Sequence, residues 1–214
     1  MSRPFSPLEF ILVIGIAFGQ FIVTSVAMLL SQSAGDGGES ALFGTAHLTG
    51  VMAYELVVAP FLLLLLHGTG WRLRHLGGAP QWEDAGRAAV LFFASYVVYY
   101  LSAVAASFAY ADEVLSTSTP PSLALVAVAS LVNGTFEEVF VCGYVIRSLA
   151  GRFGPIVAIN VSTAIRVTYH VYQGPFAFVW VGMDGLLFGY CFLRWQRIWP
   201  LVCAHALLDL VSLG

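Results

Sequence analysis

Ionisable side chains stand inside apolar stretches in the second half of the chain: Glu137, Glu138, Arg166, His170, Asp184, His205 and Asp209. An ionisable group in the hydrocarbon of a membrane costs several kcal/mol unless it is paired or faces a polar cavity, so this set indicates a functional site. Carboxylates and imidazoles are also common proton-transfer groups in enzymes. The residue types therefore point to acid–base chemistry inside a membrane.

The spacing of four of these residues gives their directions. His170 follows Arg166 by four residues, so both side chains project from one helical face. Asp209 follows His205 at the same spacing. At ~1.5 Å of rise per residue, the ionisable groups lie between ~10 and ~22 Å from the cytoplasmic ends of their spans, in one layer around mid-membrane.

The two adjacent glutamates suggest a division of roles. On a helix, Glu137 and Glu138 point about 100° apart, so one can face a cavity and the other a neighbouring helix. A glutamate in a low-dielectric site is a competent general base near neutral pH. Glu55 stands alone in an earlier apolar stretch, and we interpret it as a structural hydrogen-bonding residue.

The composition predicts the elements that position these residues. The 214 residues are 59% hydrophobic and 10% charged, whereas about a quarter of the residues in a soluble domain are charged. Several apolar stretches reach the roughly 20 residues that cross a bilayer as a helix. The predicted fold class is all-α, a polytopic transmembrane helical bundle of about seven spans: residues 8–30, 46–66, 88–110, 122–149, 155–172, 176–193 and 198–213.

The predicted spans form one integral membrane domain in two parts, the amino-terminal spans of residues 1–120 and a helical core of residues 121–214. The first span is too long for the h-region of a signal peptide and lacks a small-residue cleavage site, so we expect it to be retained. Cys142, Cys191 and Cys203 lie in apolar stretches without a C-x-x-C pair, which indicates neither a disulfide framework nor a zinc ribbon.

The basic residues predict the orientation. The chain has no lysine, and every arginine except Arg166 falls on one side of the membrane. The opposite loops hold Asp36, Glu39, Asp112 and Glu113 and no basic residue. Because cytoplasmic loops are enriched in arginine and lysine, we expect a cytoplasmic amino terminus, in a bacterial plasma membrane. The composition gives no support to nucleic-acid binding.

Three motifs in the second half of the chain resemble those of a known family. They read E-E-V-F-V-C-G-Y from Glu137, R-V-T-Y-H from Arg166, and H-A-L-L-D from His205, the last after Trp199 and Pro200. In order and spacing they resemble the motifs of the CPBP family, the CAAX-protease and bacteriocin-processing (Abi) membrane proteins. The resemblance covers the chain from residue 122 to the carboxyl terminus, whereas the first three spans match only as generic membrane helices.

The resemblance implies a glutamate-dependent intramembrane protease, with Glu138 in the catalytic set. Glu137 is implied to be the general base that activates a water, and His170 to help hold that water. His205 and Asp209 are implied to stabilise the oxyanion of the tetrahedral intermediate. Asp209 stands where the family commonly has asparagine, and an ionised carboxylate accepts hydrogen bonds but cannot donate them.

Two further departures from the family motifs suggest an exchange. Cys142 occupies the place of the arginine in E-E-x-x-x-R, and Arg166 occupies the place of a phenylalanine. We interpret these as one change: an ion pair between Arg166 and Glu138 that holds two spans in register and aims Glu137 at the water. Asp184, at a similar depth on the next span, is the competing partner; taken alone, it is most simply a structural partner of Arg166.

The sequence leaves the need for a cofactor open. Two histidines and one or two carboxylates also suit a divalent metal such as zinc, with Glu137, His170 and His205 as ligands. Their spacing differs from H-E-x-x-H, so we favour a mechanism without a metal.

The predicted function is an intramembrane endopeptidase that hydrolyses a peptide bond of a membrane-associated or prenylated peptide or protein in the lipid bilayer. Prenylated CAAX tails are the targets of the family's eukaryotic members. Two alternatives remain: a non-catalytic membrane adaptor or immunity protein of the same fold, and an ion-coupled transporter, which would also place carboxylates and histidines at mid-membrane. Inverted repeats and broken helices are not apparent in the sequence, which counts against transport.

Overall fold

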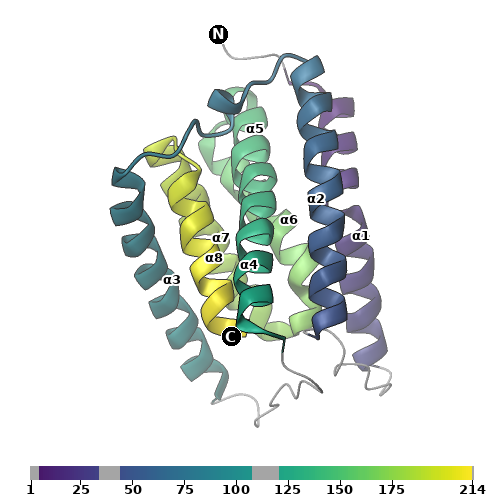
Figure 1. Cartoon of the computed structure of the whole chain (residues 1–214), viewed down its shortest axis with the longest axis vertical. Coiled ribbons are helices and arrows are strands. Elements are labelled where there is room, and N and C mark those ends of the chain that lie inside the picture. The colour runs from purple at the N-terminus through teal and green to yellow at the C-terminus, as the bar shows by residue number, and fades with distance from the viewer. Residues whose placement is uncertain (1–4, 34–43, 108–120, 214) are drawn as a thin grey trace.

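The computed structural model describes residues 5–33, 44–107 and 121–213, which form helices and no strand (Figure 1). The helices run roughly parallel or antiparallel to one another in a single bundle. Their bounds are α1 Pro7–Ser33, α2 Thr45–Gly68, α3 Glu83–Ser107, α4 Leu123–Glu137, the π-helix η3 Glu138–Ile146, α5 Arg147–Phe153, α6 Pro155–His170, α7 Pro175–Trp195 and α8 Trp199–Leu213, with the 3₁₀-helices η2 Leu73–His75 and η4 Val171–Gln173. The predicted all-α class is confirmed.

The bundle is that of an integral membrane protein. Four helical segments of the described residues are long and apolar enough to cross a membrane: Pro7–Ser31, Thr45–Gly68, Glu83–Val104 and Leu123–Phe153. The last of these is the continuous run of α4, η3 and α5. Its most apolar window is 56% buried inside the protein, against 17% to 22% for the other three. The α4–η3–α5 run is therefore the central helix, and the first three spans face lipid over most of their surface.

The helix boundaries differ from the prediction mainly at two places. The third span begins at Glu83, earlier than the predicted 88, because the acidic Glu83 and Asp84 suit a helix amino terminus. Its predicted end at 110 lies outside the described residues. The fourth span continues to Phe153, beyond the predicted 149, and ends only where Gly154 takes a φ of +86° before Pro155 starts α6.

Glycines bring the site-bearing helices close together. A Cβ on Gly134 of α4 would lie 3.2 Å from the backbone nitrogen of Ala206 and 3.3 Å from the carbonyl oxygen of Val202, both on α8. The same holds between α6 and α7, where a Cβ on Gly185 would lie 3.1 Å from Thr163. Without side chains at these points, backbones approach closely, as is common in membrane bundles. The Gly134 contact sets α8, and with it His205, directly against the glutamates of α4.

One end of the bundle carries the segments rich in arginine. Residues 69–82, Gly154 and residues 196–198 connect helices at the upper end in Figure 1, and α8 ends at the opposite end. Arg72 and Arg74 lie in the first connection, Arg152 lies just before the second, and Arg197 lies in the third. Arg197 binds the Asp84 carboxylate there through Nε and Nη2, at 2.5 and 2.6 Å. These hydrogen bonds raise the pKa of the Arg197 guanidinium above its ordinary value. Which end faces the cytoplasm stays a prediction, and the loops with the acidic residues at 36, 39, 112 and 113 lie outside the described residues.

Candidate active site

The central helix changes its winding at the two glutamates. Glu137 is the last residue of α4, and Glu138 is the first residue of the π-helix η3. A π-helical segment inside an α-helix is rare and often marks a functional site. Ser162 of α6 donates a hydrogen bond to the Val141 carbonyl oxygen of η3 at 2.8 Å. This contact fixes α6 against η3 one turn before Arg166.

Glu138 is fully buried and anchors the centre of the cluster. Its Oε1 accepts hydrogen bonds from Arg166 Nη2 at 2.6 Å and from His205 Nδ1 at 2.7 Å. Arg166 Nη2 also lies 3.9 Å from the sulfur of Cys142. The ion pair is the one that the sequence predicts for Glu138. It joins the central helix, α6 and α8 through one carboxylate oxygen, and the guanidinium occupies the space beside Cys142.

Glu137 lies beside this pair but faces a cavity. Its Oε2 accepts a hydrogen bond from the Tyr169 hydroxyl at 2.5 Å and lies 3.6 Å from Arg166 Nη1. His205 Nε2 lies 4.0 Å from the same oxygen. These contacts all involve Oε2, and Glu137 also lines the cavity. The two glutamates thus face different surroundings, as their adjacency predicts.

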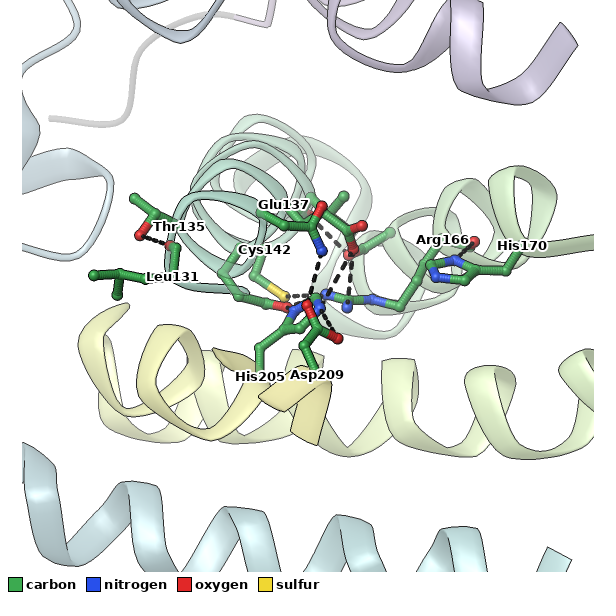
Figure 2. Close-up of polar contacts among 12 residues, drawn as sticks. Leu131, Thr135, Glu137, Cys142, Arg166, His170, His205 and Asp209 are labelled. Carbon is green, nitrogen blue, oxygen red and sulfur yellow. Dashed lines mark hydrogen bonds and ion pairs between the residues drawn. The ribbon is translucent and has the colours of Figure 1, made fainter. Parts of the chain in front are cut away.

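The far side of the cluster is formed by α8 and the second half of α4. His205 Nε2 lies 3.6 Å from Asp209 Oδ1, and Asn133 Nδ2 donates to Asp209 Oδ2 at 3.0 Å. Figure 2 shows His205 and Asp209 beside Glu137 and the Arg166 guanidinium. The structure therefore brings together the predicted residues of three different helices.

His170 stands apart from the cluster. Its Nδ1 lies 3.0 Å from the Arg166 carbonyl oxygen, and Figure 2 shows the ring beside the backbone of Arg166, away from Glu137. A carbonyl oxygen only accepts, so Nδ1 carries the proton and Nε2 is the acceptor. His170 lines the same cavity as Glu137. Its link to Glu137 would therefore pass through a molecule in the cavity.

Asp184 and Glu55 also line the cavity, but neither joins the cluster. Asp184 is buried, and its Oδ1 has no hydrogen-bond partner among the described residues. Among the described residues Asp184 forms no ion pair with Arg166, whose guanidinium binds Glu138 instead. The interpretation of Asp184 as the structural partner of Arg166 was thus wrong. Glu55 is buried to 1% exposure, and its Oε2 likewise lacks a partner within the described part of the chain.

The cavity that joins these residues has a volume of about 590 Å³. It is lined by the second half of α1, the first halves of α2, of α7 and of the α4–η3–α5 central helix, the end of α6 with η4, and the second half of α8. All these half-helices belong to the end of the bundle where α8 terminates, opposite the segments rich in arginine (Figure 1). The cavity therefore reaches the cluster from that end.

The donor set of the cluster does not fit a metal ion. Across the described ranges, no three His, Cys, Asp or Glu side chains are grouped so that they could hold one. His205 directs Nδ1 to Glu138, and the Arg166 guanidinium, itself a cation, lies 3.6 Å from Glu137. His170 is turned to a backbone carbonyl. The alternative ligand set of Glu137, His170 and His205 is thus not assembled.

Comparison with known proteins gives one family match, in the second half of the chain. Residues 119–211 match the family model described as "Type II CAAX prenyl endopeptidase Rce1-like". The matched segment is a little less than half of the chain, and it supports the resemblance to the CPBP family of CAAX proteases. Together with the membrane-spanning helices, the match is consistent with a protease that acts on a peptide or protein in the lipid bilayer. Searches of curated proteins and of solved structures gave no match.

The candidate site includes two residues to which the sequence analysis gave no role. Tyr169 binds Glu137, and Asn133 binds Asp209. Tyr169 lies within the second motif, three residues after Arg166, and Asn133 lies four residues before Glu137. Helical spacing places each on the same face as a residue already singled out. That spacing was the available signal, but neither side chain is ionised at neutral pH, so neither stood out in an apolar stretch.

Proposed function

We propose that this CPBP protease hydrolyses its substrate with a water activated by Glu137. The single observation that carries the proposal is the pair of adjacent glutamates in unlike surroundings. Glu138 is paired with Arg166 and His205, whereas Glu137 accepts a hydrogen bond at Oε2 and presents Oε1 to the cavity. A base must reach the proton that it abstracts, and of these two carboxylates only Glu137 lines the cavity.

In the first step, the water lies between Glu137 Oε1 and His170 Nε2. Glu137 takes one proton while the water oxygen attacks the scissile carbonyl carbon, and the carbonyl double bond opens to an oxyanion. His170 accepts a hydrogen bond from the other hydrogen of the water, with its tautomer set by the Arg166 carbonyl oxygen. Tyr169 and Arg166 keep the Glu137 carboxylate aimed at the water.

In the second step, the tetrahedral intermediate collapses. The carbonyl re-forms, the C–N bond breaks, and Glu137 returns its proton to the leaving amine. Protonated His205 donates from Nε2 to the oxyanion until then, while its Nδ1 stays bound to Glu138. Glu138 and Arg166 take no part in bond changes. They position His205 and Glu137.

The substrate enters from the end of the bundle where α8 terminates, because the cavity lining lies wholly in that half. With the orientation predicted from the arginines, this is the side away from the cytoplasm. The substrate class is a membrane-associated peptide, and the prenyl endopeptidases that the family model describes suggest a prenylated one. A farnesylated peptide with a fluorophore and a quencher on either side of the scissile bond is a suitable probe.

The test is cleavage of this probe, and of an unprenylated library of membrane peptides, by the purified protein in vesicles. We expect Glu137→Gln and His170→Ala each to lower the rate by about 10²- to 10⁴-fold without preventing membrane insertion, since both act on the water. Near-normal cleavage by Glu137→Gln would remove the mechanism. A wild-type protein that cleaves nothing would favour the adaptor or immunity function.

A chelator separates this mechanism from one with a metal. Because the donor set around Glu137 does not fit a metal, we expect the cleavage rate to be unchanged after treatment with a zinc chelator. Activity that is lost on chelation and returns on addition of zinc would overturn the proposal.

A further inference from the structure

The oxyanion site of this protein lacks a donor at position 209. Asp209 accepts from Asn133 at Oδ2, and its Oδ1 faces His205 Nε2. Both neighbours present N–H groups, so the carboxylate acts as an acceptor on both oxygens. An acceptor placed against a developing negative charge would disfavour the transition state. His205 is then left as the one donor of the proposed oxyanion site at this end of the cluster.

Asn133 lies where a second donor is needed. It lines the cavity, half-buried, one helical turn before Glu137 on the same face of α4. A carboxylate only accepts, so the nitrogen of the Asn133 amide faces Asp209. That nitrogen carries two N–H groups. Asp209 takes one of them, and the other is left for the cavity.

The carboxylate of Asp209 also brings the two donors together. One of its oxygens holds Asn133 Nδ2 at 3.0 Å, and the other lies 3.6 Å from His205 Nε2. Asn133 and His205 both line the cavity, so both donors border the space in which a substrate would lie. His205 Nε2 lies 4.0 Å from Glu137 Oε2, and Asn133 lies one helical turn before Glu137 on α4.

We propose that Asn133 is an oxyanion donor of this protease, and that Asp209 holds its amide in place. The donor then comes from α4, and α8 supplies the acceptor that orients it. This inference rests on the proposed hydrolytic mechanism and adds one residue to it. The competing explanation is structural: the Asn133–Asp209 hydrogen bond could serve only to join α4 to α8, whose backbones already touch at Gly134.

The two explanations differ in what Asp209→Asn does in an Asn133→Ala background. Alanine removes the donor and also the hydrogen bond between the helices. Asparagine at 209 then restores a donor beside His205 but cannot rebuild the hydrogen bond to α4, because the alanine side chain has no polar group. We expect Asn133→Ala to lower kcat for the farnesylated probe by about 10²- to 10³-fold, as for loss of one oxyanion donor, with a much smaller change in KM. The double variant should regain at least about tenfold in kcat while its Tm stays at that of Asn133→Ala.

A second variant keeps the test valid if Asn133→Ala does not fold. Asn133→Ser retains one hydroxyl donor for Asp209 and leaves none for the oxyanion, so its Tm should stay near that of the wild type while kcat falls. The matched control is Asn160→Ala, because Asn160 is an exposed asparagine of α6 that binds the Ile156 carbonyl oxygen. Its kcat should not change.

The proposal is overturned if Asn133→Ala or Asn133→Ser keeps kcat within about threefold of the wild type, a change too small for a lost oxyanion donor. It is also overturned if kcat and Tm fall together and Asp209→Asn restores neither. Wild-type cleavage that Glu137→Gln abolishes, with no effect at Asn133, would reject this inference alone. A Glu137→Gln variant that still cleaves would instead reject the proposed function.

Discussion

Two arginine–carboxylate pairs in this protein have the same chemistry but differ in their hydrogen-bond geometry and in their place in the bundle. Arg197 binds Asp84 at the end of the bundle through two hydrogen bonds, and it also donates to the Ala79 carbonyl oxygen. Arg166 binds Glu138 inside the bundle through one short hydrogen bond and spreads its remaining contacts over Glu137 and Cys142. The pair with the better geometry for an ion pair is therefore the one nearer to water.

The difference indicates what each pair is for. A forked contact at the end of a bundle joins a loop to the start of a helix, and here the Arg197 side chain stays partly exposed. A buried pair costs a large desolvation free energy, which a single hydrogen bond seldom repays, so its presence is weak support for a role in stability alone. Arg166 instead serves two adjacent carboxylates and a cysteine at once. We interpret it as a positioning residue of the active site.

The largest effect is expected from Arg166→Ala. It leaves Glu138 as a buried charge without its cation, which should lower the free energy of unfolding by about 3–5 kcal/mol. Because His205 shares the same oxygen of Glu138, the site should also shift, and a misplacement of about 1 Å can cost 10²-fold in rate. Thermal unfolding in detergent and cleavage of the farnesylated probe measure the two effects. An unchanged rate would show that the buried pair does not position the site.

The next prediction tests whether an arginine at position 142 can replace Arg166 as the partner of Glu138. In the wild type, Cys142→Arg should destabilise the protein, because two guanidinium groups would compete for Glu138. In the Arg166→Ala background the same substitution should recover part of the Tm and of the rate, since the new arginine can pair with Glu138 from its own helix. The sign of the Cys142→Arg effect should thus reverse between the two backgrounds. An equal loss in both would refute the exchange.

A double-mutant cycle locates the partner of Arg166 independently. The coupling free energy between Arg166 and Glu138 should be large, because the two atoms lie 2.6 Å apart in a buried site. The coupling between Arg166 and Asp184 should be small, since Asp184 forms no ion pair with Arg166. The reverse result would favour the competing pair that the sequence also allowed.

The Arg166–Glu138 pair can be predicted from the position of each residue along its own helix. Charges in apolar stretches must find partners, and helical rise places Arg166 and Glu138 at a similar depth. The same reasoning could not decide between Glu138 and Asp184, because depth along a span says nothing about the rotation of a helix about its axis. That rotation depends on the π-helix that begins at Glu138 and on the close approach at Gly134.

The bonding around Asp209 shows a second limit of the sequence. The motif gives the position of Asp209 but not the identity of the group that faces it from another helix. Asn133 and Tyr169 are neutral side chains, and in an apolar span such residues are most often structural. Only the packing of α4 against α8, and of α6 against the central helix, reveals that both reach the site.

The Arg197–Asp84 pair should give a smaller effect than the buried pair. Arg197→Ala removes a forked contact, but Asp84 still accepts from the Gln81 backbone N–H at 2.9 Å and keeps Arg87 Nη1 at 3.6 Å. We expect a loss of about 1 kcal/mol in the free energy of unfolding and no change in the cleavage rate, because neither residue lines the cavity. Arg194→Ala, at an exposed arginine in the last turn of α7, is the control. A fall in rate at Arg197→Ala without a fall in Tm would show that this end of the bundle also acts on the site.

The smallest effect is expected from Arg87→Ala. This variant tests whether the two hydrogen bonds from Arg197 matter more to Asp84 than a second positive charge nearby. Arg87 Nη1 lies 3.6 Å from Asp84 Oδ1, and the side chain is 39% exposed. At that distance and exposure the pair gains little over hydration, so the free energy of unfolding should change by less than about 0.5 kcal/mol. The cleavage rate should be unchanged. If Arg87→Ala destabilised the protein as much as Arg197→Ala, the forked geometry at Arg197 would have no special value. The contrast between the two pairs would then depend on burial alone.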